Sequence, residues 1–289
     1  MKYKTGPTQG GSQQYGKRVF AYALVALAFF VLVIFVLEPP PLTSCDKNPT
    51  QPCGCPTDSA FIEKKNVVLI DATDPMYGKI SDVKELINGL VAHKSGLIEW
   101  IKSGKRVSQT SIFILNRTLP AEMTPVGRYC QLPPTIALMT AMSSTDEEAL
   151  KSAINEKIAG AANSIPDLNS APESQIVKAL ATTTNSATYW TPGSNLILVS
   201  DLYENSATCG FFETAPIPSF SRINDHCTSW VERLKGNIAS AKSNVSICTI
   251  FTKNPKEGLV RFWNDLFLYS AGRSPLYSCS PAEILSRGQ

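Results

Sequence analysis

Two patterns of apolar residues repeat along most of the chain: short continuous apolar runs, and longer stretches with a helical spacing. The apolar runs predict buried strands, and the helical stretches predict helices that cover them. We expect strands at residues 66–70, 110–115, 195–200 and 245–251. We expect helices at residues 81–103, 145–163, 172–187, 223–243 and 256–270. This alternation predicts an α/β fold, doubly wound around a mostly parallel sheet that is buried on both faces.

One apolar run is too long to be a strand. Residues 20–37 hold no charge, and a run of about 18 apolar residues can cross a bilayer as one helix. Basic residues precede the run without any acid, and Glu38 with three prolines follows it. The positive-inside rule therefore predicts a cytoplasmic N-terminus, with the rest of the chain outside the membrane.

Two alternatives exist for this segment. A cleaved signal peptide normally has a shorter apolar region and a small-residue exit, which is not evident here. A lipoprotein signal would use Cys45, because residues 42–45 (LTSC) resemble a lipobox, although Glu-Pro-Pro-Pro separates them from the apolar run. An uncleaved anchor is the favoured prediction.

These features divide the chain into four predicted parts. They are a cytoplasmic tail at residues 1–18, a transmembrane helix at 19–37, a Pro- and Cys-rich linker at 38–60, and an extracytoplasmic domain at 61–289. The bilayer is thus a predicted partner through residues 19–37. The formal net charge of +3 and the lack of a dense Lys/Arg stripe argue against nucleic acid as a partner.

All eight cysteines follow the apolar run, and an even count in an exported domain predicts disulfides. Cys248 lies inside an apolar strand and is interpreted as a buried free thiol. The disulfide candidates are Cys45, Cys53, Cys55, Cys130, Cys209, Cys227 and Cys279.

Spacing favours one local pairing among these cysteines. Cys209 and Cys227 bracket a single loop-like stretch and are the favoured local pair. Cys53 and Cys55 lie in a Pro-rich segment and are expected to reach elsewhere, with Cys279 as one candidate partner.

Two predicted strands end in acids, at Asp71 and Asp201. In parallel α/β folds, ligands bind outside the carboxyl ends of the strands. If the two strands are neighbours, both carboxylates lie on one edge. A second interpretation is that each acid only bonds amides of its own loop. The run Tyr203-Glu204-Asn205-Ser206 after Asp201 reads as ordinary loop chemistry.

From residue 64 to residue 275 the chain resembles the von Willebrand factor A family. Asp71-Ala72-Thr73-Asp74-Pro75 is similar to its Asp-x-Ser-x-Ser element, and Leu198-Val199-Ser200-Asp201-Leu202 is similar to its later strand–Ser/Thr-Asp-Gly element. The resemblance implies a metal-ion-dependent adhesion site, with Mg²⁺ or another divalent cation held by Asp71, Thr73 and Asp201. Oxygen ligands and retained waters suit Mg²⁺.

The chain departs from the family pattern at three points. Pro75 stands where the second hydroxyl belongs, and Leu202 replaces the glycine after the second acid. The middle threonine has no secure counterpart, and Thr124 in the 117–135 loop is the candidate. The implied site is therefore degenerate.

The anchor, the stapled linker and the domain together predict a non-catalytic, protein-binding subunit of a bacterial envelope assembly, set in the inner membrane and facing the periplasm. An inert scaffold subunit is the first alternative. A metal-dependent phosphoester hydrolase is the second, although Asp71-Ala72-Thr73 lacks the second acid of an Asp-x-Asp element. No G-x-S-x-G, P-loop or G-x-G-x-x-G motif is present in the sequence.

Overall fold

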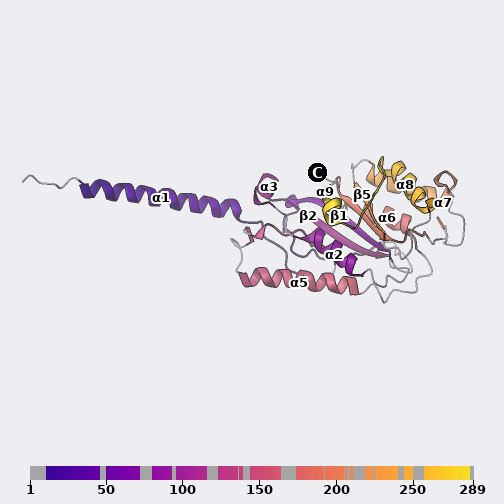
Figure 1. Cartoon of the computed structure of the whole chain (residues 1–289), viewed down its shortest axis with the longest axis horizontal. Coiled ribbons are helices and arrows are strands. Elements are labelled where there is room, and N and C mark those ends of the chain that lie inside the picture. The colour runs from indigo at the N-terminus through magenta and orange to yellow at the C-terminus, as the bar shows by residue number, and fades with distance from the viewer. Residues whose placement is uncertain are drawn as a thin grey trace, which may run out of the picture.

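The structure is a computed structural model in which a long N-terminal helix projects from an α/β domain (Figure 1). It describes residues 11–45, 50–71, 80–92, 96–115, 123–135, 137–138, 144–163, 174–191, 193–204, 206, 209–210, 219–223, 225–239, 244–249 and 257–286. The helices are α1 (Gly11–Leu37), α2 (Ile80–Val91), α3 (Leu97–Lys102), α5 (Ser144–Asn163), α6 (Ile176–Thr184), α7 (Asp225–Ile238), α8 (Glu257–Ala271) and α9 (Pro281–Ser286), with short 3₁₀ turns η1 (Ser59–Phe61) and η3 (Phe220–Arg222). The strands are β1 (Ile62–Asp71), β2 (Val107–Leu115), β3 (Gly127–Cys130), β4 (Asn195–Ser200), β5 (Asn244–Thr249) and β6 (Leu276–Tyr277).

The six strands form one sheet in the order β3-β2-β1-β4-β5-β6. All neighbouring strands run parallel except β2 and β3, which are antiparallel. The predicted α/β class with a mostly parallel sheet is therefore confirmed. The antiparallel edge strand β3 lies inside the stretch 117–135 that was expected to be a loop, because a four-residue strand is too short to show a clear apolar run.

Side chains alternate between two cores along β1. Val67 and Leu69 pack into a core with residues of α6, α7 and α8. Val68 and Ile70 pack into a second core with residues of α2, α5 and α9. This alternation explains why the strand reads as a continuous apolar run, since both of its faces are buried.

The predicted helix at 81–103 is not continuous. The structure has α2 and α3 in its place, and α3 begins after Gly96, whose φ of +92° is outside helical geometry. Apolar spacing continues across this break, since α2 packs in the second core and α3 contributes Trp100 to a third cluster. Periodicity alone therefore could not reveal the interruption.

Part of the predicted linker is hydrogen-bonded to the domain. We call residues 38–45 and 50–58 the strap. The amide of Thr43 donates to the carbonyl of Cys55, at 2.6 Å. Cys53 exchanges backbone hydrogen bonds with the β3 region, donating to Arg128 and accepting from Cys130, and a disulfide joins Cys55 to Cys130. The strap thus continues the structure of the domain up to the end of α1.

The segment Val19–Leu37 of α1 is long and apolar enough to cross a membrane, and none of it is buried against the rest of the chain. A signal sequence near an N-terminus would meet the same criterion. Together with four disulfides, this segment is consistent with an anchored, non-cytoplasmic domain.

The anchor end of the domain is the amino edge of the sheet. Lys105, two residues before β2, donates hydrogen bonds from its ammonium to the carbonyls of Phe35 and Glu38 at the end of α1. Phe61, directly before β1, lines the same junction. Because β1 and β2 are parallel, their carboxyl ends point away from α1 (Figure 1).

Candidate functional site at the carboxyl edge of the sheet

The two acid-ending strands are neighbours in the sheet. β1 pairs with β4 in parallel, with Ile70 opposite Val199, so Asp71 and Ser200 end the two strands side by side. Asp201 follows immediately. The two acids singled out from the sequence therefore lie at the same edge of the sheet.

Asp71 is the centre of a buried group of hydroxyls. Its side chain is 4% exposed, and its Oδ2 accepts hydrogen bonds from Ser174 Oγ at 2.8 Å and from Ser200 Oγ at 2.9 Å. Ser200 Oγ also accepts from the amide of Leu202, at 2.7 Å. Hydrogen bonds to a carboxylate are stronger than those between neutral groups, so Asp71 fixes the ends of β1 and β4 to the segment before α6.

Glu204 is a second buried carboxyl group, at the start of α6. Its Oε2 accepts from the amide of Val177 at 3.0 Å, and its Oε1 accepts from Ser206 Oγ at 2.7 Å. The first amides of a helix have no partner inside the helix, and Glu204 supplies one. Burial, opposed by these hydrogen bonds and reinforced by the charge of Asp71, raises the pKa of Glu204 to about 8. Glu204 is therefore mostly protonated at neutral pH.

Asp201 and Leu202 form the turn that leaves β4. The Oδ1 of Asp201 accepts from the amide of Tyr203 at 3.0 Å, inside its own loop. Leu202 is fully buried and has a φ of +71°, the left-handed region that glycine adopts without strain. Its carbonyl accepts from Trp263 Nε1 at 2.9 Å. The turn thus has the backbone conformation that favours glycine, while leucine adds a side chain to the core.

The other two candidate residues are not part of the described group. Thr73 lies outside the described residues. Thr124 is exposed in the loop before β3, and no hydrogen bond joins it to Asp71 in the described part of the chain. Among the described residues, a hydroxyl from the segment between β1 and β4 does reach Asp71, and it belongs to Ser174.

Sequence reasoning missed two residues of this group, Ser174 and Glu204. The expected helix at 172–187 placed Ser174 inside a helix, whereas α6 begins at Ile176 and leaves Ser174 in the preceding segment. Glu204 was interpreted as ordinary loop chemistry, but its side chain is 1% exposed. No pattern in the sequence marks Ser174, because the N-cap of α6, the position that hydroxyl residues favour, is Gln175.

The described oxygens are of the type that a divalent cation binds, and the residues that carry them are buried. Asp71, Ser174, Ser200 and Glu204 are between 0% and 4% exposed. The two serine hydroxyls already donate to Asp71. Among the described residues, no group of three or more His, Cys, Asp or Glu could hold a metal ion. The described residues thus form a buried hydrogen-bonded group around Asp71, and the cation at Asp71, Thr73 and Asp201 stays a prediction, because Thr73 lies outside the described residues.

All eight cysteines are paired in the structure. The pairs are Cys45–Cys53, Cys55–Cys130, Cys209–Cys227 and Cys248–Cys279.

Cys209–Cys227 is the local pair that the sequence favoured, and it ties the loop after β4 to the first turn of α7. The interpretation of Cys248 as a free thiol is wrong, because Cys279 reaches it from the segment after β6. The same disulfide excludes Cys279 as the partner of Cys53 or Cys55.

Comparison with known proteins gives no family. No family model matches the chain, and no curated protein matches it. The human COPII-coat protein Sec24c is similar in structure with a TM-score of 0.41 and 10% sequence identity, over 77% of this chain and 30% of that chain. The chain therefore spans less than a third of the length of that protein.

Proposed function

We propose that the chain is a membrane-anchored interaction module, a non-catalytic subunit of a bacterial envelope assembly that is held in the inner membrane by α1. Its domain lies in the periplasm and binds other envelope proteins through the carboxyl edge of the sheet. The orientation of the sheet relative to α1 is the observation that supports this proposal.

The carboxyl edge is the part of the sheet farthest from the anchor. Lys105 and Phe61 place the amino ends of β2 and β1 at the end of α1. β1 has 10 residues, and at about 3.3 Å per residue it carries Asp71 roughly 30 Å beyond that point. Loops at this edge are therefore presented away from the bilayer surface, where a second envelope protein can meet them.

The buried polar group has a supporting role in this proposal. Asp71 and Glu204 tie β1, β4 and α6 together below the surface. Glu204 also bonds Ser206, whose Oγ accepts from the amide of Cys209, so Ser206 and Cys209 are held by this group and by the Cys209–Cys227 disulfide. Loop residues fixed in this way can bind a partner with little loss of conformational entropy.

Site-specific photo-crosslinking in intact membranes tests the proposal. A crosslinking residue at Thr124 or Gly210, both exposed at the carboxyl edge, is expected to give a discrete adduct with another envelope protein. A crosslinking residue at Ser59, exposed next to the anchor end, is the matched control and is expected to give none. Adducts only from Ser59, or from none of the three positions, would overturn the proposal and favour an inert scaffold.

The cation predicted at Asp71, Thr73 and Asp201 is not part of this proposal. Divalent-cation dependence of the crosslinks examines it separately. If chelation of divalent cations abolishes the Gly210 adduct, and Asp71→Ala abolishes it while the domain stays folded, a divalent cation is part of the binding surface.

A further inference from the structure

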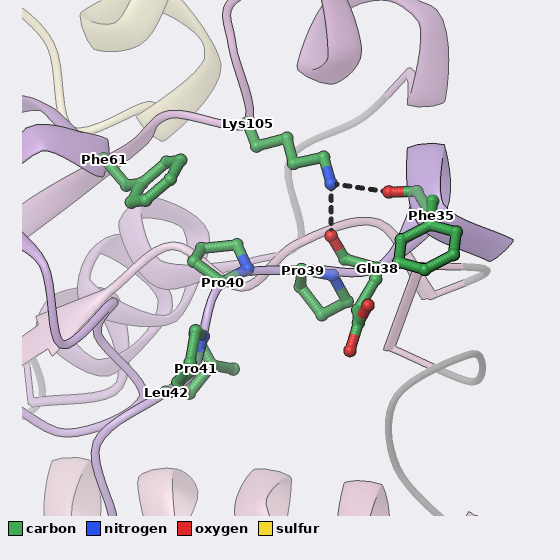
Figure 2. A pocket seen from close by; sticks show the side chains of 8 residues that line it. All are labelled: Phe35, Glu38, Pro39, Pro40, Pro41, Leu42, Phe61 and Lys105. Carbon is green, nitrogen blue, oxygen red and sulfur yellow. Dashed lines mark hydrogen bonds between the residues drawn. The ribbon is translucent and has the colours of Figure 1, made fainter. Parts of the chain in front are cut away.

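A hollow of about 520 Å³ lies between the end of α1 and the domain (Figure 2). Most of its wall is apolar, and it holds one basic and one acidic residue. The lining residues are Phe35, Glu38, Pro39, Pro40, Pro41, Leu42, Phe61 and Lys105. Its position at the end of the anchor sets it at the boundary between the hydrocarbon and the water if α1 spans a bilayer.

Lys105 is held in place at the top of this hollow. Its backbone has a φ of +63°, and its amide donates to the carbonyl of Trp100 at 2.9 Å. Its ammonium donates to the carbonyls of Phe35, at 3.2 Å, and Glu38. An ammonium has three N–H donors, so one remains for a further acceptor after these two bonds.

Glu38 brings the opposite charge to the same hollow. Its carbonyl accepts from Lys105, but Figure 2 shows its carboxylate on the other side of its backbone, turned away from the ammonium. The side chain is exposed. The hollow therefore presents a cation and an anion that are close together but do not neutralise each other.

We propose that this hollow binds the headgroup of one zwitterionic phospholipid of the phosphatidylethanolamine class. The lipid phosphate accepts the remaining N–H of Lys105, and the lipid ammonium pairs with the carboxylate of Glu38. The apolar chains continue along the side of α1 that carries Phe35, whose side chain is 69% exposed. This inference rests on the proposed placement of α1 in a bilayer, and it adds a lipid ligand that the proposed partner binding does not require.

The chemistry of the hollow favours a zwitterionic headgroup over an anionic headgroup or an apolar ligand. A headgroup with only negative charge would be repelled by Glu38, and an apolar ligand would offer no acceptor to the third N–H of Lys105 and no cation to Glu38. The three prolines restrict the wall of the hollow, since proline fixes its own φ. A pre-shaped hollow loses less conformational entropy when a headgroup binds.

Native mass spectrometry of the full chain, titrated in detergent with phosphatidylethanolamine or phosphatidylglycerol, tests this proposal. The unaltered chain is expected to retain one phosphatidylethanolamine and to bind phosphatidylglycerol more weakly. Glu38→Gln and Lys105→Gln are each expected to weaken phosphatidylethanolamine binding about tenfold, because each loses one charge-assisted contact. Lys102→Gln is the matched control, an exposed lysine on α3 that does not line the hollow, and is expected to bind normally.

Equal phosphatidylethanolamine binding by the unaltered chain, Glu38→Gln and Lys105→Gln would overturn the proposal, as would a preference for phosphatidylglycerol. If Lys105→Gln unfolds the domain, as read from tryptophan fluorescence, Glu38→Gln decides the outcome, because its carbonyl bond to Lys105 is unchanged. Flotation of each variant with membranes reports the anchor separately. A chain that floats but shows no headgroup selectivity overturns the lipid site alone and leaves the proposed partner binding standing.

Discussion

Replacing Glu204 with glutamine is expected to stabilise the domain, increasingly so as the pH rises. The carboxyl group is buried, and its pKa is raised from 4.5 to about 8. In the unfolded chain it loses its proton near its ordinary pKa, whereas in the folded chain it keeps the proton until about pH 8. Between these values the folded state binds more protons than the unfolded state, so stability falls as the pH rises.

The size of this effect follows from the two pKa values. Each pH unit between them costs about 1.4 kcal/mol, which amounts to about 5 kcal/mol across the whole interval from 4.5 to about 8. Glutamine keeps a carbonyl oxygen for the amide of Val177 but has no proton to lose. The difference in free energy of unfolding between Glu204→Gln and the unaltered chain should therefore grow, in favour of the variant, by roughly 3–4 kcal/mol as the pH rises from about 5 to about 8.

Guanidinium unfolding of both proteins in mild detergent measures this difference, with disulfides intact and tryptophan fluorescence as the signal. Trp100, Trp190 and Trp263 are buried in the folded domain and report its loss. Taking the difference between the two proteins removes the contribution of other titrating groups. A difference that stays constant with pH, or one that favours the unaltered chain at high pH, would refute the assignment of a protonated Glu204.

Three further predictions concern the same domain. Asp71→Asn removes the negative charge of the carboxylate that accepts hydrogen bonds from Ser174 and Ser200. It should lower the free energy of unfolding by about 1–3 kcal/mol and shift the pH dependence caused by Glu204 to lower pH. An unchanged unfolding midpoint would contradict the closed hydrogen-bonded group. Replacing both cysteines of the 31-residue Cys248–Cys279 loop by serine should cost about 3–4 kcal/mol in the chain-entropy description, measured by denaturant unfolding; a loss below about 1 kcal/mol would show that the bridge adds little. Millimolar Mg²⁺ should leave the thermal unfolding midpoint unchanged, because the group around Asp71 is closed; a rise that Asp71→Asn abolishes would instead establish the predicted cation.

The central strands were predictable because each is buried on both faces. β1, β4 and β5 read as continuous apolar runs, and the acids after β1 and β4 marked the edge where the polar group was found. The adjacency of β1 and β4 could not be read from the sequence, since more than a hundred residues separate the end of β1 from the start of β4. The short edge strands β3 and β6 carry too few residues for a pattern and were missed.

The buried polar residues at the carboxyl edge of the sheet could be predicted only in part. Asp71 could be recognised because it follows an apolar run. Ser174 and Glu204 lie in polar stretches, where the sequence pattern does not show which residues are buried. Glu204 is distinguished by its hydrogen bond from the amide of Val177 at the start of α6, and these two residues are 27 positions apart in the sequence. Polar residues that are buried to satisfy a distant backbone group cannot be told from loop residues by pattern alone.

The covalent links of the strap determine how tension on the anchor enters the sheet. A pull on α1 travels first along the strap to Cys55, where the Cys55–Cys130 disulfide diverts part of the load to β3 before it reaches β1. The Cys45–Cys53 disulfide shortens that route by bypassing the residues between its two ends. The edge strand, which pairs with β2 in the sheet and is hydrogen-bonded to the strap at Cys53, therefore takes force that would otherwise pull directly on the central strand. With its disulfides intact the domain should tolerate a stronger pull on α1, whereas reduction would leave only hydrogen bonds, such as those of Cys53 to Arg128 and Cys130, to share the load with β1.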